Sequence, residues 1–375
     1  MTDTLTPPTT TDTDAVDPTE AMVDRLFEAL LGTTEVYAAF LGDRLGWYDA
    51  LAESSRTAPE LAEATGTDAR YAREWLEHQT VAGYLTVVDP TAEADERRFE
   101  MPEAHRPVLA DRDDLAHVLP LARFVGGLGL RLDDMVDAYR TGAGIGWHAH
   151  GAHGREGQAA ANRPMFLNQL GPEYLAAIPE VDEALRGGGC VADVGCGFGW
   201  SAIGVALAYP DATVDGFDID APSVERAREN AAAYGVADRV RFHVVDAGDD
   251  LAADHPGTFD VVLALECIHD LPQPVEVLST MRRLTAPDGT TIVMDERVGE
   301  RFTGEGDPIE RIMYGFSLLC CLPDGRAHEH SVATGTVMRP ATLEGYATDA
   351  GFGGIEILPL DNDFFRFYRL VPTSA

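Results

Sequence analysis

Three glycines that alternate with other residues are the strongest chemical signal in the sequence. Gly195, Gly197 and Gly199 follow a predicted buried strand and precede a predicted helix. Glycines in such a turn let the backbone bend tightly and approach a ligand where a Cβ would not fit. A dinucleotide fingerprint would need a small residue in place of Trp200, and Asp193 before the turn would repel a pyrophosphate. The turn therefore favours a ligand with a cationic amino acid group over a nicotinamide cofactor.

Acidic residues follow three further predicted strands. Asp218 lies 23 residues after Gly195, close to the roughly 20-residue offset at which a carboxylate binds both ribose hydroxyls. Ligands of open α/β sheets bind at the carboxyl ends of the strands, so acids that recur there predict one site. The predicted strands and the residues after them are 212–217 with Asp218, 240–245 with Asp246 and Ala247, and 259–265 with Glu266.

A histidine and an aspartate come soon after the last of these strands. The imidazole of His269, with an ordinary pKa near 6.5, suits general-base catalysis, and Asp270 could orient the ring. The alternative is that His269 only caps or packs the loop, while Glu266 approaches the cofactor. The residues by themselves leave both alternatives open.

Two other segments contain side chains of types that can bind metals. Segment 147–153 carries three imidazoles, but no carboxylate or cysteine lies at a fitting spacing, so we predict no metal. The apolar run 314–322 contains two adjacent cysteines, which in such a run are usually core residues. We interpret this run, with Met165 and Phe166, as the wall of an apolar acceptor pocket.

The order of these motifs resembles that of a known enzyme family. Val-Ala-Asp-Val-Gly-Cys-Gly-Phe-Gly, Gly-Phe-Asp-Ile-Asp, Val-Val-Asp-Ala and Phe-Asp-Val-Val look like the motifs of class I S-adenosylmethionine-dependent methyltransferases. The resemblance covers about Met22 to Leu370. It implies an α/β fold: a Rossmann-like seven-stranded methyltransferase sheet with an N-terminal all-α/winged-helix domain and a helical bridge.

The resemblance also implies S-adenosylmethionine as the cofactor and assigns residues to it. The implied contacts are Gly195, Gly197 and Gly199 with the methionine portion, Asp193 with its amino acid end, Asp218 with the ribose, and Asp246 with Ala247 at the adenine; Glu266 is a further candidate. His269 and Asp270 remain the candidate catalytic residues.

The chain divides into four predicted parts. These are a disordered acidic lead at 1–18, a winged-helix dimerisation domain at 19–105, a helical bridge or lid at 106–185, and the methyltransferase domain at 186–372. Apolar spacing over 22–52 predicts helices buried on more than one side, with possible breaks at Gly32 and Gly42. In the bridge we expect breaks at Pro120, Pro164 and Pro172, and a glycine-rich loop over 142–154.

The winged-helix pattern raises DNA binding as an alternative. Pro59 and Gly66 bound one predicted helix, and Asp68 caps a second with Tyr71, Trp75 and Leu76 on one face; strands 85–88 and 98–101 follow. The would-be recognition helix and the wing tip carry more acids than arginines, the opposite of what phosphates need. We therefore expect a homodimer through this domain rather than a nucleic-acid partner.

Composition narrows the setting. The formal charge is -35, from 63 acidic and 28 basic residues, and all 28 are arginine. We interpret this as adaptation to a high-salt cytoplasm, as in halophiles; the alternative is a high-GC genome that favours arginine. No segment approaches the roughly 18 to 20 apolar residues of a membrane span, no secretory signal is present, and five cysteines show no pairing pattern. We expect a cytoplasmic protein with reduced thiols.

Together these features predict an S-adenosylmethionine-dependent methyltransferase that transfers a methyl group in line to a small, partly apolar acceptor. Two alternatives stay open. One is a transcription regulator that uses a methyltransferase-like domain as a ligand sensor. The other is a nicotinamide oxidoreductase. Trp200 and the short hairpin expected near the C-terminus, at 354–360 and 364–370, argue against it.

Overall fold

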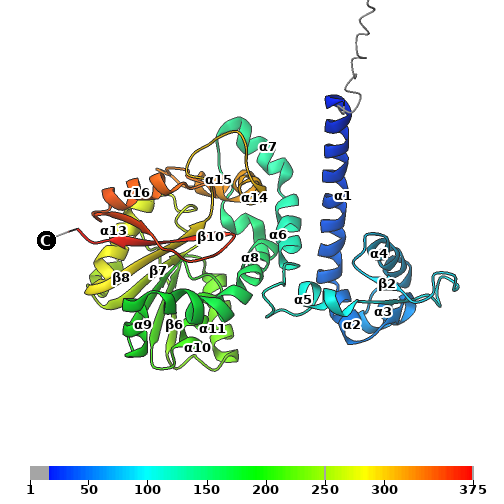
Figure 1. Ribbon diagram of the computed structural model, residues 1–375, viewed down its shortest axis with the longest axis horizontal. Coiled ribbons are helices and arrows are strands. Elements are labelled where there is room, and N and C mark those ends of the chain that lie inside the picture. Colours follow the sequence, from blue (N-terminus) through cyan, green and yellow to red (C-terminus); the bar gives the residue numbers. More distant parts are fainter. Residues whose placement is uncertain (1–16, 249–250, 374–375) are drawn as a thin grey trace, which may run out of the picture.

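The computed structural model describes residues 17–248 and 251–373. Its two lobes lie on either side of one long helix, α1 (Pro18–Arg44), which contacts both of them (Figure 1). The smaller lobe is a winged helix and the larger one is a sheet covered by helices on both faces. No helix within these residues is both long enough and apolar enough to span a bilayer.

Helix α1 is continuous, so the expected breaks at Gly32 and Gly42 are wrong. A Cβ on Gly32 would have no atom within 4 Å, whereas a Cβ on Gly42 would lie 2.6 Å from the ring of Tyr48. The expectation of burial on several sides is wrong too. Leu26 and Leu30 are 57% and 56% exposed, because this half of α1 projects beyond the winged-helix lobe (Figure 1).

The small lobe forms through local capping and an aromatic core. A capping box of Thr57 and Glu60 begins α3 (Ala58–Thr65), and Asp68 caps α4 (Ala69–Val81). Trp75 is buried as expected, but Tyr71 is 75% exposed, so its predicted place on the buried face is wrong. The other elements are α2 (Trp47–Glu53), β1 (Arg56–Thr57), β2 (Thr86–Val87) and β3 (Arg98–Glu100), with the three strands paired in the order β1-β3-β2.

The bridge is more helical than its prolines and glycines suggest. Pro120 begins α6 (Pro120–Gly129), but Pro164 lies within α8 (Gly151–Met165) and Pro172 within η3 (Phe166–Tyr174). The wide π-helical turns of η3 accommodate the missing N–H, so only the first expected break is present. η1 (Glu103–His105) ends the winged-helix part. The remaining bridge elements are α5 (Arg106–Leu109), α7 (Leu132–Thr141), η2 (Trp147–His150), η4 (Leu175–Ala177) and α9 (Pro179–Arg186).

The large lobe is built on the predicted seven-stranded sheet. Its order is β6-β5-β4-β7-β8-β10-β9, parallel except for the last two pairings, in which β10 runs antiparallel to β8 and to β9. The strands are β4 (Cys190–Val194), β5 (Thr213–Asp218), β6 (Val240–Val244), β7 (Phe259–Leu265), β8 (Thr285–Glu296), β9 (Gly354–Ile357) and β10 (Phe365–Val371). Residues 286–289 form an irregularity inside β8, where the register with β7 shifts.

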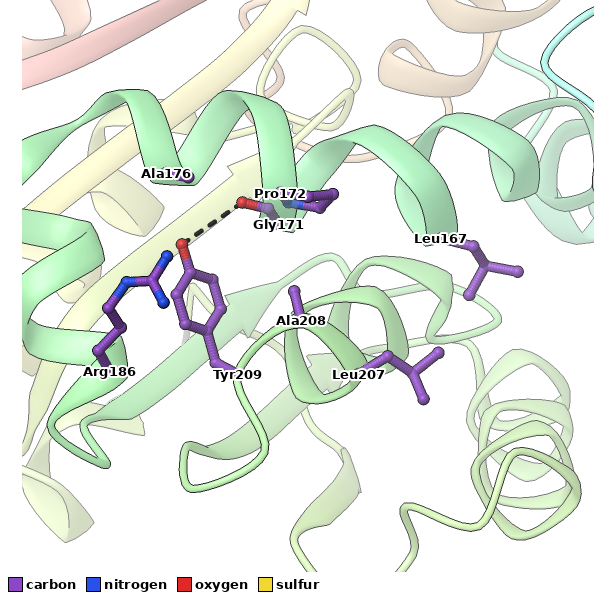
Figure 2. A pocket seen from close by; sticks show the side chains of 8 residues that line it. All are labelled: Leu167, Gly171, Pro172, Ala176, Arg186, Leu207, Ala208 and Tyr209. Atoms are coloured by element: carbon purple, nitrogen blue, oxygen red, sulfur yellow. Dashed lines mark hydrogen bonds between the residues drawn. The ribbon is translucent and has the colours of Figure 1, made fainter.

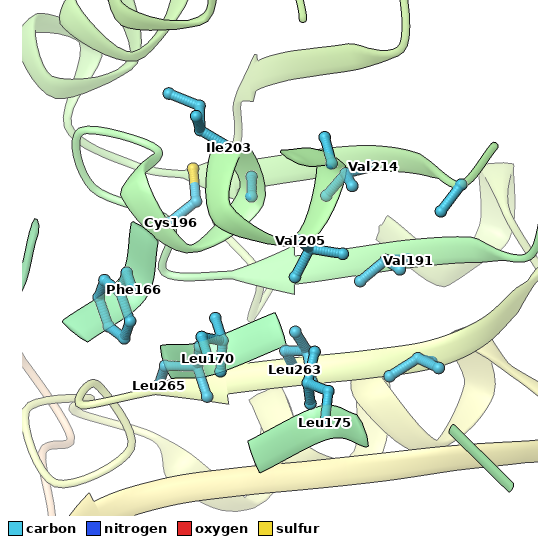
Figure 3. Close-up of a cluster of buried hydrophobic side chains, with 14 of the residues drawn as sticks. Phe166, Leu170, Leu175, Val191, Cys196, Ile203, Val205, Val214, Leu263 and Leu265 are labelled. Carbon is cyan, nitrogen blue, oxygen red and sulfur yellow. The ribbon is translucent and has the colours of Figure 1, made fainter. Parts of the chain in front are cut away.

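Helices cover both faces of this sheet. On one face η3, η4, α9, α10 (Trp200–Ala208) and α11 (Ala221–Ala233) bury the side chains that Figure 3 shows. On the other face lie α12 (Leu251–Asp254), α13 (Pro274–Leu284) and α16 (Pro340–Asp349). An insertion between β8 and β9 adds α14 (Pro308–Phe316), η5 (Ser317–Cys321) and α15 (Leu322–Gly325).

The contact between α10 and η3 predicts a sharp effect of one methyl group. A Cβ on Gly204 would collide with the carbonyl of Phe166, so we expect Gly204→Ala to lower the free energy of unfolding by about 1–3 kcal/mol. A Cβ on Gly345 in α16 would have no atom within 4 Å, so Gly345→Ala should raise the free energy of unfolding by about 0.5–1 kcal/mol. Urea unfolding compares the two variants; equal effects would contradict this packing.

Candidate active site

The glycine turn joins the end of β4 to the start of α10. All three glycines have positive φ, of 76° at Gly195, 51° at Gly197 and 76° at Gly199. A Cβ on Gly195 would lie 2.8 Å from the sulfur of Cys267, and one on Gly199 would meet Phe242 at 2.5 Å. Nothing lies within 4 Å of the same position on Gly197. Two of the glycines thus permit close packing, while the third borders open space at the carboxyl edge of the sheet.

Two predicted acids stand beside this turn. Asp218, at the end of β5, accepts hydrogen bonds from the backbone N–H groups of Gly197 and Asp220, both at 2.8 Å. Burial raises its pKa. Asp193 lies behind the turn, fully buried, and accepts a hydrogen bond of 2.5 Å from the Ser201 hydroxyl. Burial raises the pKa of Asp193 to about 6. Asp218 therefore borders the open side of the turn, and Asp193 supports it from within.

The other two predicted strand ends lie on either side of these residues. Asp246 and Ala247 follow β6, which pairs with β5, and the exposed carboxylate of Asp246 accepts a hydrogen bond of 2.8 Å from Gly248. Glu266 follows β7 with a left-handed backbone, at φ 55°. Burial raises the pKa of Glu266 to about 8, so this carboxyl group holds a proton at neutral pH. The structure therefore places all of the predicted cofactor residues at one edge of the sheet.

His269 lies just beyond Glu266 and is almost fully enclosed by acids. The ring is 3% exposed, and its Nδ1 is 2.8 Å from Asp295 Oδ1 and 3.0 Å from Glu296 Oε2. Its Nε2 is 3.3 Å from Asp270 Oδ1. Asp295 and Glu296 end β8, so their place beside His269 depends on the pairing of β7 with β8. Sequence reasoning did not identify either acid, because they lie 26 residues or more away along the chain.

The charges in this cluster shift several pKa values. Burial opposes protonation of His269, but Asp270, Asp295 and Glu296 outweigh it and raise the pKa of His269 well above its usual value. Burial raises the pKa of Glu296 well above its usual value, whereas the neighbouring His269 overcomes burial and lowers that of Asp295. The cluster therefore favours the charged forms of His269 and Asp295 and the neutral form of Glu296.

Helix α8 ties the bridge to the strand ends through side chains that the sequence did not single out. Arg155 donates two hydrogen bonds to Asp220, at 2.7 and 2.9 Å, and Asn162 donates to the carboxyl group of Glu266. The two residues are seven apart and so lie on the same helix face. That spacing was visible in the sequence, but the face it meets was not.

A second connection joins the bridge to the insertion after β8. The backbone N–H of Trp147 donates to Asp324 at 2.7 Å, and burial raises the pKa of Asp324 to about 7. Nearby, Cys320 and Cys321 pack with Phe124 and with the partly buried Trp147 in a small apolar cluster. Phe166 does not belong to this wall; it packs in the sheet core with Leu170 and Leu175 (Figure 3).

One pocket of the described chain lies away from these residues. It measures about 300 Å³ and lies between η3 and the end of α10 (Figure 2). Tyr209 at its edge donates to Asp182 at 2.9 Å. Helix α10 begins at the glycine turn and runs back along the sheet, so this pocket is at the amino ends of the strands. It takes no part in the site described above.

Two parts of the chain match known domains. Residues 36–111 match the Rv2258c-like winged HTH domain, and residues 186–329 match the methyltransferase domain. The ubiquinone biosynthesis O-methyltransferase of Thiobacillus denitrificans is 38% identical over 182 residues, which are 48% of this chain and 72% of that protein.

Solved structures share the whole architecture. The mitomycin 7-O-methyltransferase MmcR has a TM-score of 0.69 at 22% identity, covering 95% of this chain and 99% of its own. The human N-acetylserotonin methyltransferase in complex with S-adenosylmethionine has a TM-score of 0.63 at 16% identity, covering 96% and 99%. At these identities the structures show the fold, and the curated relative shows the family.

S-adenosylmethionine is accordingly the cofactor, and the site fits it. The open space at Gly197 accommodates backbone contact with a ligand, and Asp218 borders that space with an acceptor carboxylate. The fold, the domain matches and the curated relative agree: the chain belongs to the S-adenosylmethionine-dependent O-methyltransferase family.

Proposed function

We propose that this methyltransferase methylates the hydroxyl oxygen of a small, partly apolar acceptor, and that His269 takes the hydroxyl proton. The hydrogen bond between His269 Nδ1 and Asp295 is the observation that carries this proposal. It holds the ring in one orientation and assigns the Nδ1 proton, which leaves Nε2 as the position that accepts a proton once the imidazolium has lost its own. Nε2 lies just past the end of β7, next to the strand that begins the glycine turn.

The cofactor contacts follow from the strand ends. We assign the methionine portion to the three-glycine turn with Asp193 behind it, the ribose to Asp218, and the adenine to Asp246 and Ala247, with Glu266 facing the cofactor's side of the site. Bound S-adenosylmethionine supplies a methyl group on a positively charged sulfur. The protein's own task is to hold the acceptor oxygen in line, exclude water and accept the proton.

The raised pKa of His269 suggests which hydroxyl it deprotonates. A base works best when its pKa approaches that of the group it deprotonates, and a phenolic hydroxyl titrates near 10. Asp270, Asp295 and Glu296 move the pKa of His269 upward, toward that value. A phenol-like acceptor therefore matches this base better than an aliphatic alcohol does.

Aromatic side chains above the base support an acceptor of this kind. Phe124 and Phe316 meet edge to face, with ring centroids 5.4 Å apart, and Trp147 packs on the same cluster. Phe124 comes from α6 and Phe316 from α14, so the cluster joins the bridge to the insertion. We infer an apolar cap over the reacting hydroxyl that keeps water away from it.

We also propose that the protein forms a homodimer through α1. Six residues from successive turns of this helix are large and apolar, and their side chains are between 41% and 62% exposed. They are Met22, Val23, Leu26, Phe27, Leu30 and Leu31. An apolar helix face of this size is stabilised by packing against a second copy.

The winged-helix lobe suits dimerisation better than DNA binding. Arg97 contacts Glu77 at 2.6 Å and Arg98 contacts Glu60 at 2.7 Å, so arginines of the wing already have acidic partners.

The comparisons favour the enzyme over a ligand-sensing regulator. The net charge of -35 supports a cytoplasm with molar salt, in which the self-repulsion of the acids is screened.

Cofactor binding is tested by calorimetric titration of S-adenosylmethionine in molar KCl. We expect Asp218→Ala to weaken binding by at least about tenfold, because a carboxylate that accepts from two ribose hydroxyls is lost. The affinity of Asp218→Asn should lie between those of the unaltered protein and Asp218→Ala, since asparagine keeps an acceptor for the N–H of Gly197. Asp238→Ala, at an exposed site of the same domain, is the control. Equal binding by all four proteins would contradict the ribose assignment.

The base is tested by the pH dependence of kcat/KM with a phenolic acceptor. Activity requires neutral His269, so the rate should rise with pH as the imidazolium loses its proton, with a midpoint above the usual histidine value. Asp270→Asn removes a negative charge, lowers the pKa of His269 and should move the rising limb to lower pH. His269→Gln should reduce kcat about 10²–10⁴-fold.

Cofactor titration of both variants checks that they fold. An unchanged pH profile in Asp270→Asn, or one that moves to higher pH, would refute the electrostatic argument. Transfer to amines with no transfer to phenols would refute oxygen as the acceptor atom.

Dimerisation is tested by sedimentation at several protein concentrations. We expect the full-length protein to be a dimer, and Phe27→Glu with Leu30→Glu to make it a monomer, because two charges would be buried at the interface. Val81→Glu places a charge on an equally apolar side chain, 91% exposed, at the end of α4 and should leave the dimer intact. A dimer that survives the double substitution would place the interface elsewhere.

A further inference from the structure

Three metal-binding side chains converge beside the acceptor position. One ligand atom each from His269, Asp270 and Cys321 lies within 4.8 Å of the others. Cys321 ends η5, in the insertion after β8, whereas the other two follow β7. The sequence did not suggest this group, since the thiol and the imidazole lie more than 50 positions apart.

The distance between two of these atoms fits a shared ion. His269 Nε2 and Asp270 Oδ1 are 3.3 Å apart but form no hydrogen bond of acceptable geometry, and within the described residues no donor reaches this buried oxygen. Tetrahedral bonds of about 2.0–2.1 Å separate two ligand atoms by about 3.3–3.4 Å. The pair therefore has the spacing of neighbouring metal ligands.

The other nitrogen of His269 has the support that metal-binding histidines use. Nδ1 lies 2.8 Å from the Asp295 carboxylate, an arrangement that orients the ring and makes Nε2 a better ligand. A second possible group, His269 with Asp295 and Glu296, also lies within ligand distance. In that group Nδ1 already forms a hydrogen bond with Asp295, whereas Nε2 forms none in the described chain, and no thiol is present.

A further polar side chain near the cluster has no partner. Both ring nitrogens of His150 are buried without a hydrogen bond in the described chain, and the residue is 4% exposed. Asp270 is among the charges that act on the pKa of His150, which places the ring close to the cluster. Buried polar atoms without partners are rare and indicate an ion, a water or a ligand that satisfies them.

We propose that His269, Asp270 and Cys321 bind a thiophilic divalent metal ion such as Zn²⁺, and that its binding inhibits methyl transfer. A thiolate with an imidazole and a carboxylate selects zinc-like ions over magnesium or calcium. On binding, the Cys321 thiol and the His269 imidazolium each release a proton to solvent, and the freed sulfur and Nε2 bond the metal. The inhibition rests on the proposed function, because the metal occupies the Nε2 lone pair that would accept the acceptor's proton.

Metal binding is tested on the full-length, reduced protein without any methyl acceptor. Titration with Co²⁺, a spectroscopic substitute for Zn²⁺, should produce an ultraviolet thiolate-to-cobalt charge-transfer band that Zn²⁺ displaces. Cys321→Ser should abolish the band, and Asp270→Asn should weaken binding at least about tenfold. Cys190→Ser is the matched control, because this partly exposed cysteine begins β4 at the opposite edge of the sheet.

Two results would overturn the proposal: no charge-transfer band in the unaltered protein, or a band that persists in Cys321→Ser. S-adenosylmethionine binding by each variant shows whether it is folded. If Cys321→Ser is not folded, the cobalt affinity of Asp270→Asn tests the metal site in its place.

Inhibition is then measured separately as the Zn²⁺ concentration that halves the rate of each protein relative to its own metal-free rate. We expect Cys321→Ser to need at least about tenfold more Zn²⁺ than Cys190→Ser does. Equal sensitivity would refute inhibition through this site. If no acceptor is ever methylated, the proposed function fails but the cobalt spectrum still decides the metal site.

Discussion

The parallel pairing of β4 with β5 on one side and β7 on the other is the constraint on which the site depends. In this register Val194 lies beside Phe217 and Ala264, so the three chains leave the sheet at the same edge. Neighbouring strands are about 4.8 Å apart, which brings the glycine turn, Asp218 and the loop of His269 within reach of one ligand. The core residues of these strands are completely buried, and their packing makes the register strict.

Enclosure of that edge accounts for its unusual electrostatics. Helix α8 covers the strand ends through Arg155 and Asn162, and η2 is tied to Asp324 beyond them. Most carboxyl groups that the sheet places together thereby lose contact with water, and their pKa values rise because the charged forms are poorly solvated. Asp295 is the exception, because the neighbouring His269 keeps its pKa low. Burial alone would lower the pKa of His269, but the acids enclosed with it raise that pKa, and Asp270 Oδ1 accepts no hydrogen bond in the described chain.

Local signals in the sequence were reliable where one short segment decides the outcome. Four of the strands, the capped helices of the winged lobe and the turn at Gly195, Gly197 and Gly199 follow from periodicity and glycine placement, and the family resemblance implied the rest of the seven-stranded sheet. Errors arose where a distant segment decides. Pro172 does not interrupt the helix, because packing of η3 against α10 maintains it.

The sequence by itself determined the kind of sheet, the cofactor turn and the strand-end acids, because each depends on backbone conformation and alternation within a few residues. It also marked His269 and Asp270 as a pair. Only the tertiary structure decided what surrounds that pair, because Asp295, Glu296 and Cys321 reach the imidazole from separate elements. The pKa of a buried ring depends on its neighbours in space, and the chain order does not specify those neighbours.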